Sequence, residues 1–305
     1  TAVSITQALL DRVPDTSFVI DHMLALAATP GDPFFGSIDA QHIGVAGHSL
    51  GGFTALAVKS GYQGIPPDAR VGAIMPIAPG ASWISDAELA NITVPTLFMT
   101  GTLDGLLAEE AHAAGLIPPG TTVYRADVVG ATHTHFANIC DIANALIAFG
   151  LGPSTWPTIG AAALIDPYNV TCIPPAFSIA EATRIQNLYA TAFFRRHLLG
   201  ETSYDRFLVA HYAGEQEPAV LFSRTAGPHY AMRGLRMMVN DPSRDPADRH
   251  LEATVRERPT QLDPIVGDPT IAGATLRVRV RGAAAEQSFP LPAAGWTART
   301  GGYRF

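Results

Sequence analysis

The stretch from Ile43 to Gly52, Ile-Gly-Val-Ala-Gly-His-Ser-Leu-Gly-Gly, constrains the fold of this chain more than any other segment. Its apolar first half predicts a buried strand, and the residues from Phe53 to Lys59 predict a helix directly after it. The Gly-x-Ser-x-Gly pattern between them is typical of a sharp strand-to-helix turn that exposes its serine. Because a Cβ at Gly47 or Gly51 would collide with the neighbouring strand or helix, we expect both glycines to be required. Ser49 is therefore the candidate nucleophile, and a glycine-rich turn without chemistry is the alternative.

Strands and helices alternate along the first two thirds of the chain. Nearly continuous apolar runs, typical of parallel strands covered on both faces, occupy 71–78, the segment from residue 94, and 121–129. Helical patterns occupy 85–90, 107–114, 136–149 and 178–199, and 1–28 predicts one or two helices with a break at Pro14. A Pro/Gly-rich excursion is expected at 150–175. This order predicts an α/β fold with a mostly parallel, doubly wound sheet.

Two more candidate residues follow the ends of predicted strands. Asp104 comes after the strand that starts at residue 94, and His133 comes after the strand at 121–129. In a doubly wound sheet, chemistry collects in the loops beyond the carboxyl ends of the strands. Ser49, Asp104 and His133 thus occur in the order nucleophile, acid and base, which is the order of the α/β-hydrolase triad. His135 is the alternative base, and otherwise a supporting or surface residue.

Four segments resemble secreted serine α/β-hydrolases of the dienelactone-hydrolase-like and platelet-activating-factor-acetylhydrolase-like branch. They are Pro-Asp-Thr-Ser-Phe-Val-Ile-Asp-His-Met-Leu from residue 14, the segment around Ser49, Thr-Gly-Thr-Leu-Asp ending at Asp104, and Gly-Ala-Thr-His-Thr-His-Phe from residue 130. The resemblance covers about residues 1–205. It implies carboxylic ester hydrolysis, and it favours His133 over His135 because the family histidine follows Gly-x-x.

The resemblance also implies a mechanism and a substrate class. The expected reaction passes through an acyl-enzyme on Ser49, needs no cofactor, and uses the Leu50 amide in the oxyanion hole. Trp83 and Trp156 are expected to line an open site for short to medium acyl esters or phospholipid-type esters, and core packing is the alternative for each. An acyltransferase or peptidase with the same triad, or a non-catalytic binding module, are the rival functions. A metal held by His133 and His135 is disfavoured, because no nearby Asp-His completes a site.

We expect two domains, a catalytic α/β-hydrolase domain at 1–212 and a β-rich domain at 213–305. The alternating run from Ala274 to Arg281 predicts a strand in the second domain, and the acidic segment 241–248 predicts a solvated turn. Members of the family that this chain resembles begin with several further strands. One of these strands is followed by a His-Gly loop, whose amide is the second hydrogen-bond donor of the oxyanion hole. The fold is therefore expected to be N-terminally incomplete, both ends to be truncated, and the Ser49 strand to lie near the middle of a larger sheet.

Charge, hydropathy and cysteine content limit which partners and which compartment we expect for this chain. The net charge of −7 over 305 residues, without long runs of one sign, argues against nucleic acid. No apolar run approaches the roughly 18 residues that a transmembrane helix needs. Cys140 and Cys172 are too few for a disulfide scaffold but suffice for one bridge, with two buried free thiols as the alternative. A bridge would suit a secreted or periplasmic protein.

Overall fold

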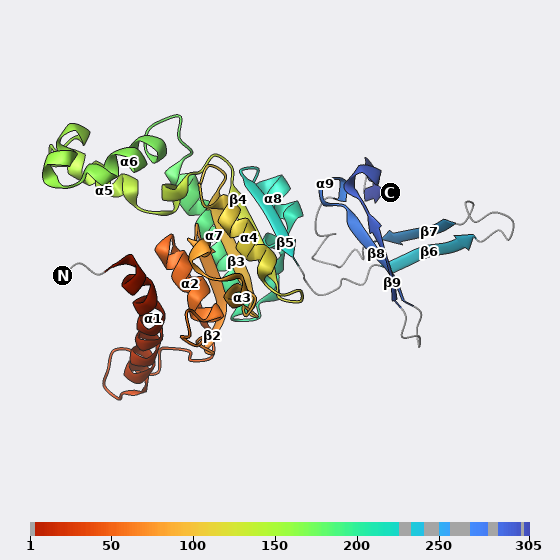
Figure 1. Ribbon diagram of the computed structural model, residues 1–305, viewed down its shortest axis with the longest axis horizontal. Helices are drawn as coiled ribbons and strands as arrows, with labels where there is room; N and C mark the ends of the chain where they lie inside the picture. The colour runs from red at the N-terminus through yellow and green to blue at the C-terminus, as the bar shows by residue number, and fades with distance from the viewer. Residues whose placement is uncertain (1–3, 226–232, 241–249, 257–268, 280–285, 300–301) are drawn as a thin grey trace. The chain divides into compact units, whose positions relative to one another are not determined.

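The computed structural model describes residues 4–225, 233–240, 250–256, 269–279, 286–299 and 302–305 (Figure 1). The first of these ranges contains a five-stranded sheet with the order β1-β2-β3-β4-β5. Four strands are parallel to one another, namely β1 (Ile43–His48), β2 (Val71–Ile77), β3 (Thr96–Gly101) and β4 (Val123–Val128). β5 (Val220–Thr225) pairs with β4 in the antiparallel direction. The mostly parallel sheet predicted from the apolar runs is confirmed.

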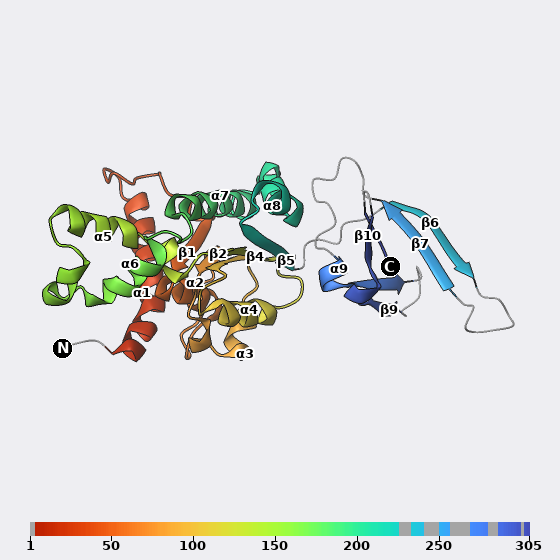
Figure 2. The ribbon, with the colours of Figure 1, turned by 90° about the horizontal axis from the view of Figure 1, so that it is seen from above.

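Helices cover both faces of this sheet (Figure 2). One face carries α1 (Ile5–Ala28), α2 (Leu50–Ser60), α3 (Asp86–Leu89) and α4 (Leu107–Leu116). The other face carries α7 (Ile179–His197), together with residues of η5 (Thr202–Phe207). Neighbouring residues in a strand point to opposite faces, so Ile74 packs in the first core and Met75 in the second. The central strands are therefore apolar on both sides, which explains their continuous apolar runs.

The first helix is a single element, although Pro14 was expected to break it. α1 runs without interruption through this proline. Leu9 and Val13, on the turns before Pro14, are buried in the same core as α2. This packing holds the helix together where the proline removes one backbone hydrogen bond.

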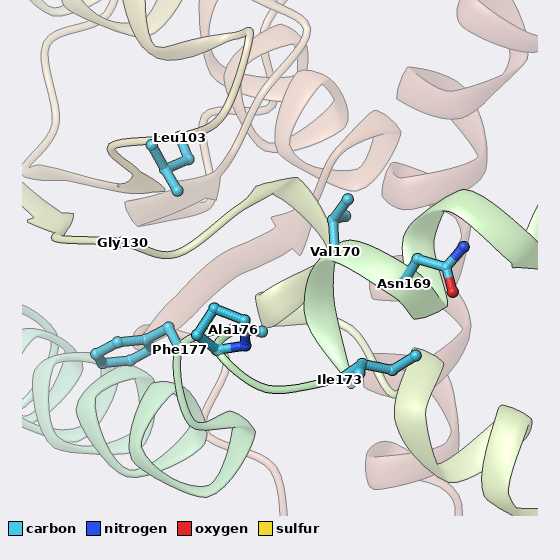
Figure 3. Close-up of a pocket in the computed structure, with 8 residues that line it drawn as sticks. Leu103, Gly130, Asn169, Val170, Ile173, Ala176 and Phe177 are labelled. Atoms are coloured by element: carbon cyan, nitrogen blue, oxygen red, sulfur yellow. The ribbon is translucent and has the colours of Figure 1, made fainter.

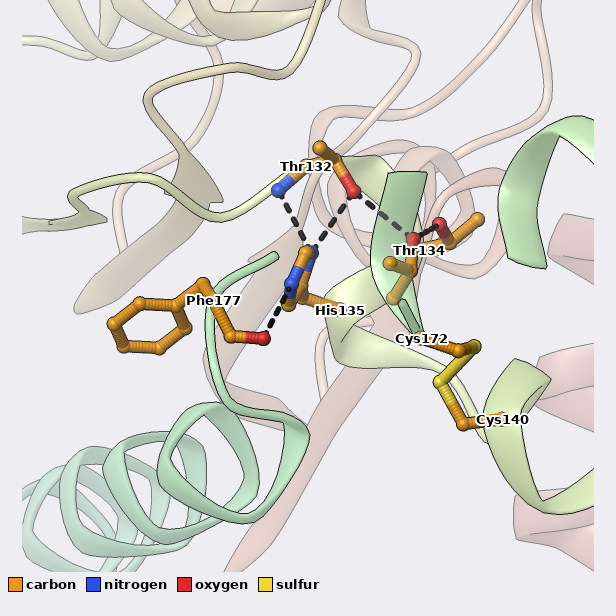
Figure 4. Close-up of a disulfide and its surroundings, with 7 residues drawn as sticks. Thr132, Thr134, His135, Cys140, Cys172 and Phe177 are labelled. Carbon is orange, nitrogen blue, oxygen red and sulfur yellow. Dashed lines mark hydrogen bonds between the residues drawn. A yellow bond between two sulfur atoms is a disulfide. The ribbon is translucent and has the colours of Figure 1, made fainter. Parts of the chain in front are cut away.

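The segment between β4 and α7 contains more helix than its Pro/Gly content predicts. It holds η2 (His133–Phe136), α5 (Ile139–Ala148), η3 (Pro153–Ile159), η4 (Ala162–Leu164) and α6 (Ile165–Thr171). A disulfide joins Cys140 at the start of α5 to Cys172, the residue after α6 (Figure 4). We call residues 150–178 the excursion. The disulfide fixes the end of α6 to the first turn of α5, which follows η2 in the chain.

The five-stranded sheet extends beyond the domain boundary expected at residue 212. α8 (Ala210–Gln216) leads into β5, whose residues pair with β4 along its whole length from Val123 to Val128. The boundary was placed too early because β5 lies after the last strong helical pattern and its pairing partner is distant in sequence. Chain contacts divide the protein into the compact units Thr1–Asp263 and Pro264–Phe305.

The remaining described elements are mostly strands in antiparallel pairs. β6 (Arg233–Asn240) pairs with β7 (His250–Arg256), β8 (Ala274–Arg279) with β9 (Glu286–Leu291), and β10 (Thr297–Arg299) with β11 (Gly302–Arg304). Short helical turns α9 (Pro269–Ala272) and η7 (Ala293–Gly295) accompany them. The acidic segment 241–248 lies outside the described residues.

Candidate active site

Ser49 occupies the sharp turn between β1 and α2. Its backbone has φ 58° and ψ −115°, a left-handed region that a residue with a side chain rarely adopts. The Ser49 amide donates to the carbonyl oxygen of Ile77 at 2.8 Å, which anchors the turn to the end of β2. Such strain costs about 1–3 kcal/mol and persists only where the surroundings enforce it. The turn therefore has the strained conformation expected of a nucleophilic serine at a sharp strand-to-helix turn.

The glycines around Ser49 have different reasons for being there. A Cβ on Gly47 would lie 2.5 Å from the Gly51 carbonyl carbon and oxygen, so only glycine fits at position 47. A Cβ on Gly51 would meet nothing within 4 Å, so the collision expected at that position is wrong. The second close approach belongs to Gly52 instead, where a Cβ would lie 2.8 Å from the Ile77 carbonyl oxygen. The Gly51 backbone lies close to Gly47, but the position that its own Cβ would occupy is open.

The three residues singled out from their chain order form one hydrogen-bonded line. His133 Nε2 lies 2.9 Å from Ser49 Oγ, and His133 Nδ1 lies 2.9 Å from Asp104 Oδ2. Ser49 follows β1, Asp104 follows β3 and His133 follows β4, so the carboxyl edge of the sheet brings them together. The imidazole can thus take a proton from the serine while the carboxylate holds its other nitrogen.

Asp104 is held as a carboxylate by its neighbours. Burial raises the pKa of this carboxyl, but the hydrogen bonds from His133, the Leu106 amide and the Thr100 hydroxyl lower it further, so the net pKa lies below its ordinary value. The Leu106 amide donates to Oδ1 at 2.9 Å and the Thr100 hydroxyl to Oδ2 at 3.2 Å. A charged acceptor therefore faces His133 Nδ1 at neutral pH.

Comparison with known families agrees with this geometry. A family model described as "PETase: PET hydrolase-like" matches residues 5–149, a range that contains all three residues of the line. The chain has an α/β-hydrolase fold. The match indicates a hydrolase of carboxylic esters, whereas the narrower dienelactone-hydrolase-like and acetylhydrolase-like branch stays a prediction. A search of curated proteins finds no match.

His48 contacts the residue proposed as the base, His133, and sequence reasoning missed this contact. Its Nε2 donates to the backbone carbonyl oxygen of His133 at 2.8 Å, and the two rings lie 4.7 Å apart between centroids. Burial lowers the pKa of His48, with a smaller opposing effect from that backbone hydrogen bond. The neutral ring still carries the proton that it donates. The signal was its place directly before Ser49, which puts it at the end of β1 beside the other loops.

His135 is buried and faces away from the serine. The Thr132 amide donates to His135 Nδ1 at 2.9 Å, so the ring proton sits on Nε2 and is donated to the Phe177 carbonyl oxygen at 3.0 Å (Figure 4). Burial lowers the pKa of His135 and favours the neutral ring. The expectation of a surface residue is wrong, since His135 is 2% exposed. It ties the base loop to the excursion.

The two tryptophans expected to line the site differ in burial. Trp83, in η1 (Ala81–Trp83) just after β2, is 45% exposed and packs edge-on against Phe53, so its role as a lining residue stays a prediction. Trp156 is fully buried, donates its indole N–H to the Leu151 carbonyl and packs on Tyr168. Trp156 therefore fills the core of the excursion, and its expected place in an open site is wrong.

Leu50 is the first residue of α2, directly after Ser49. The first amides of a helix have no acceptor within the helix, and they point toward its N-terminal end. The Leu50 amide is thus suited to the oxyanion role, which stays a prediction. Within the described ranges, no three His, Cys, Asp or Glu side chains are grouped as a metal site, and no helix there is long and apolar enough to cross a membrane.

Proposed function

We propose that this chain is a serine hydrolase of carboxylic esters that works through an acyl-enzyme on Ser49. The observation that carries the proposal is the line from Asp104 through His133 to Ser49, with both links at 2.9 Å and the serine on a strained turn. The family match supports ester hydrolysis independently. Short to medium acyl esters and phospholipid-type esters are the proposed substrates.

The proposed reaction has two halves. Ser49 Oγ attacks the ester carbonyl carbon while His133 Nε2 takes the hydroxyl proton, and the Leu50 amide binds the oxygen that becomes negative. Asp104 stabilises the imidazolium that forms. The intermediate then expels the alcohol, which takes the proton from His133, and the acyl group stays on Ser49. Water activated by His133 repeats the sequence, releasing the acid and restoring the serine.

The same residues suit an acyltransferase, in which an alcohol takes the place of the attacking water. They also suit a peptidase, in which the group that leaves is an amine instead of an alcohol. A non-catalytic binding module is the rival outside enzymes. The tight hydrogen-bonded line argues against that rival, because a binding module has no need for a strained serine that contacts a histidine. The matching family is described by hydrolysis of PET, an aromatic polyester, so oligomers of such polyesters join the candidate substrates.

The disulfide between Cys140 and Cys172 is informative about the compartment in which the protein functions. Disulfides persist in oxidising compartments and are rare in the cytosol. The bridge between Cys140 and Cys172 supports our proposal that the protein is secreted or periplasmic.

Hydrolysis of p-nitrophenyl acetate tests the proposed function. Wild type is expected to release p-nitrophenol with saturation kinetics, and Ser49→Ala is expected to be at least about 10³-fold slower. Ser60→Ala, which changes a buried serine at the other end of α2, serves as the control and is expected to retain activity. Equal rates for wild type and Ser49→Ala would reject the serine mechanism. Adding a primary alcohol as acceptor then separates acyl transfer from hydrolysis.

A further inference from the structure

An apolar hollow of about 410 Å³ lies between the catalytic loops and the excursion (Figure 3). Leu103 and Gly130 form one side, and Val170, Ile173 and Phe177 contribute to the other. Its volume falls within the roughly 300–1,000 Å³ of typical ligand pockets. Among the described side chains that line it, that of Asn169 is the polar one. The hollow thus offers hydrocarbon contact with a single amide beside it.

The hollow is lined by residues of the two loops that carry Asp104 and His133. Leu103 immediately precedes Asp104, and Gly130 lies three residues before His133. On the excursion side, the Thr171 hydroxyl hydrogen-bonds the Thr134 hydroxyl, next to His133 in the chain. The loops that position the acid and the base therefore also carry residues of this apolar surface.

The apolar walls are exposed where a core residue would be covered. Leu103 is 66% exposed, Val170 53% and Ile173 40%. Removing apolar surface from water is favourable, and these three exposed side chains line the same hollow without covering one another. An apolar ligand between them would remove part of this exposed surface from water.

The excursion wall is fixed in place by three separate ties (Figure 4). The disulfide holds Cys172 to Cys140. The buried Thr171 hydroxyl bonds Thr132 at 3.2 Å and also Thr134. His135 donates to the Phe177 carbonyl. A wall held this firmly keeps its shape before a ligand arrives, which lowers the entropic cost of binding.

We propose that this hollow binds the aliphatic chain of the ester substrate and selects medium-chain esters over acetyl or methyl esters. This inference rests on the proposed function and adds a subsite to it. The chain could come from the acyl or the alcohol part of the ester, because both carry the same hydrocarbon chemistry. The Asp104 and His133 loops would then have a second role, since Leu103 and Gly130 of these loops form one side of the hollow.

Two pairs of esters test the proposal. The acyl pair is p-nitrophenyl acetate and p-nitrophenyl hexanoate, and the alcohol pair is methyl acetate and hexyl acetate. Wild type is expected to prefer the longer ester in one pair, which identifies the part bound. Val170→Asn and Leu103→Asn are expected to lower that preference, as a ratio of kcat/KM, by about tenfold. Leu199→Asn, which changes another exposed aliphatic side chain, located after α7, is the control and should leave the ratio unchanged.

The same design separates failure of the inference from failure of the proposed function. Unchanged ratios in both hollow variants, or no preference for the longer ester in either pair, would overturn the inference while the esterase function stands. If wild type hydrolyses none of the four esters, the proposed function fails. The hollow is then judged by calorimetric binding of p-nitrophenyl hexanoate to Ser49→Ala. Weaker binding after adding Val170→Asn supports it, and equal binding contradicts it.

Discussion

His133 Nε2 lies 2.9 Å from Ser49 Oγ although 84 residues separate them in the chain. The contact forms because β1 and β4 are parallel strands of one sheet, so the loops after their carboxyl ends meet at the same edge. The hydrogen bond between His133 and Asp104 forms for the same reason, because Asp104 follows β3, another parallel strand of this sheet. The chemistry proposed for this chain therefore depends on the parallel sheet as well as on the local motif around Ser49.

The two neighbouring histidines provide the first prediction. His133→Ala is expected to lower kcat for p-nitrophenyl acetate by about 10³-fold or more, because it removes the general base. His135→Asn is expected to be much milder, since His135 holds the excursion and makes no contact with Ser49. Asp104→Asn should fall between them. Steady-state kinetics check the order, and full activity of His133→Ala with loss of activity in His135→Asn would transfer the base role to His135.

The glycines around Ser49 give a matched pair of variants. Gly47→Ala places a Cβ 2.5 Å from backbone atoms of Gly51, and we expect it to lower the free energy of unfolding by about 1–3 kcal/mol. Gly51→Ala meets no atom within 4 Å and lies in a helix, where alanine is favoured over glycine by roughly 1 kcal/mol. Urea unfolding measures both. Similar losses for the two variants would contradict the geometry of the turn.

The disulfide is expected to stabilise the fold. Cys140 and Cys172 are separated by 32 residues, and closing a loop of this length contributes about 3–4 kcal/mol in the chain-entropy model. Urea unfolding of the double variant Cys140→Ala/Cys172→Ala should give a free energy of unfolding lower by this amount than that of oxidised wild type. Reduced wild type should show the same decrease. If mass spectrometry finds two free thiols in protein purified from an oxidising compartment without reductant, the bridge does not form.

His197 predicts a loss of stability in acid. Burial, and to a smaller extent the nearby Arg196 and Arg224, lowers its pKa to about 4 from an ordinary 6.5. The unfolded chain therefore binds this proton more readily than the folded one, and stability falls as pH drops below about 6.5. His197→Gln keeps a partner for the Tyr124 hydroxyl but does not titrate. Between pH 7.5 and 4, wild type should lose about 3 kcal/mol more than this variant, and equal losses would contradict the assignment.

The sheet and the three central residues could be predicted because they depend on patterns within short segments. Continuous apolar runs indicate strands buried on both faces, and a polar residue directly after such a run lies at the carboxyl edge. Ser49, Asp104 and His133 satisfy both conditions. Their order along the chain then limited the fold to one arrangement.

The excursion could not be predicted in the same way. The bond between Thr171 and Thr134 joins residues 37 positions apart, and that between His135 and Phe177 joins residues 42 apart. No local pattern encodes such contacts, so the helix α6 was not expected within the Pro/Gly-rich segment, and Trp156 was expected to line the site with core packing as the alternative. The boundary at residue 212 failed for a similar reason, because β5 is recognised only by its pairing with β4.

Covalent labelling tests the central claim most directly. A fluorophosphonate forms a bond to a serine only when a neighbouring base activates it, so the adduct marks the working nucleophile. Wild-type protein treated with the reagent, digested and analysed by mass spectrometry should carry one adduct on the peptide that contains Ser49. His133→Ala should label far more slowly, and Ser49→Ala not at all. An adduct on another serine, or an unlabelled wild type under conditions that label a known serine esterase, would contradict the account.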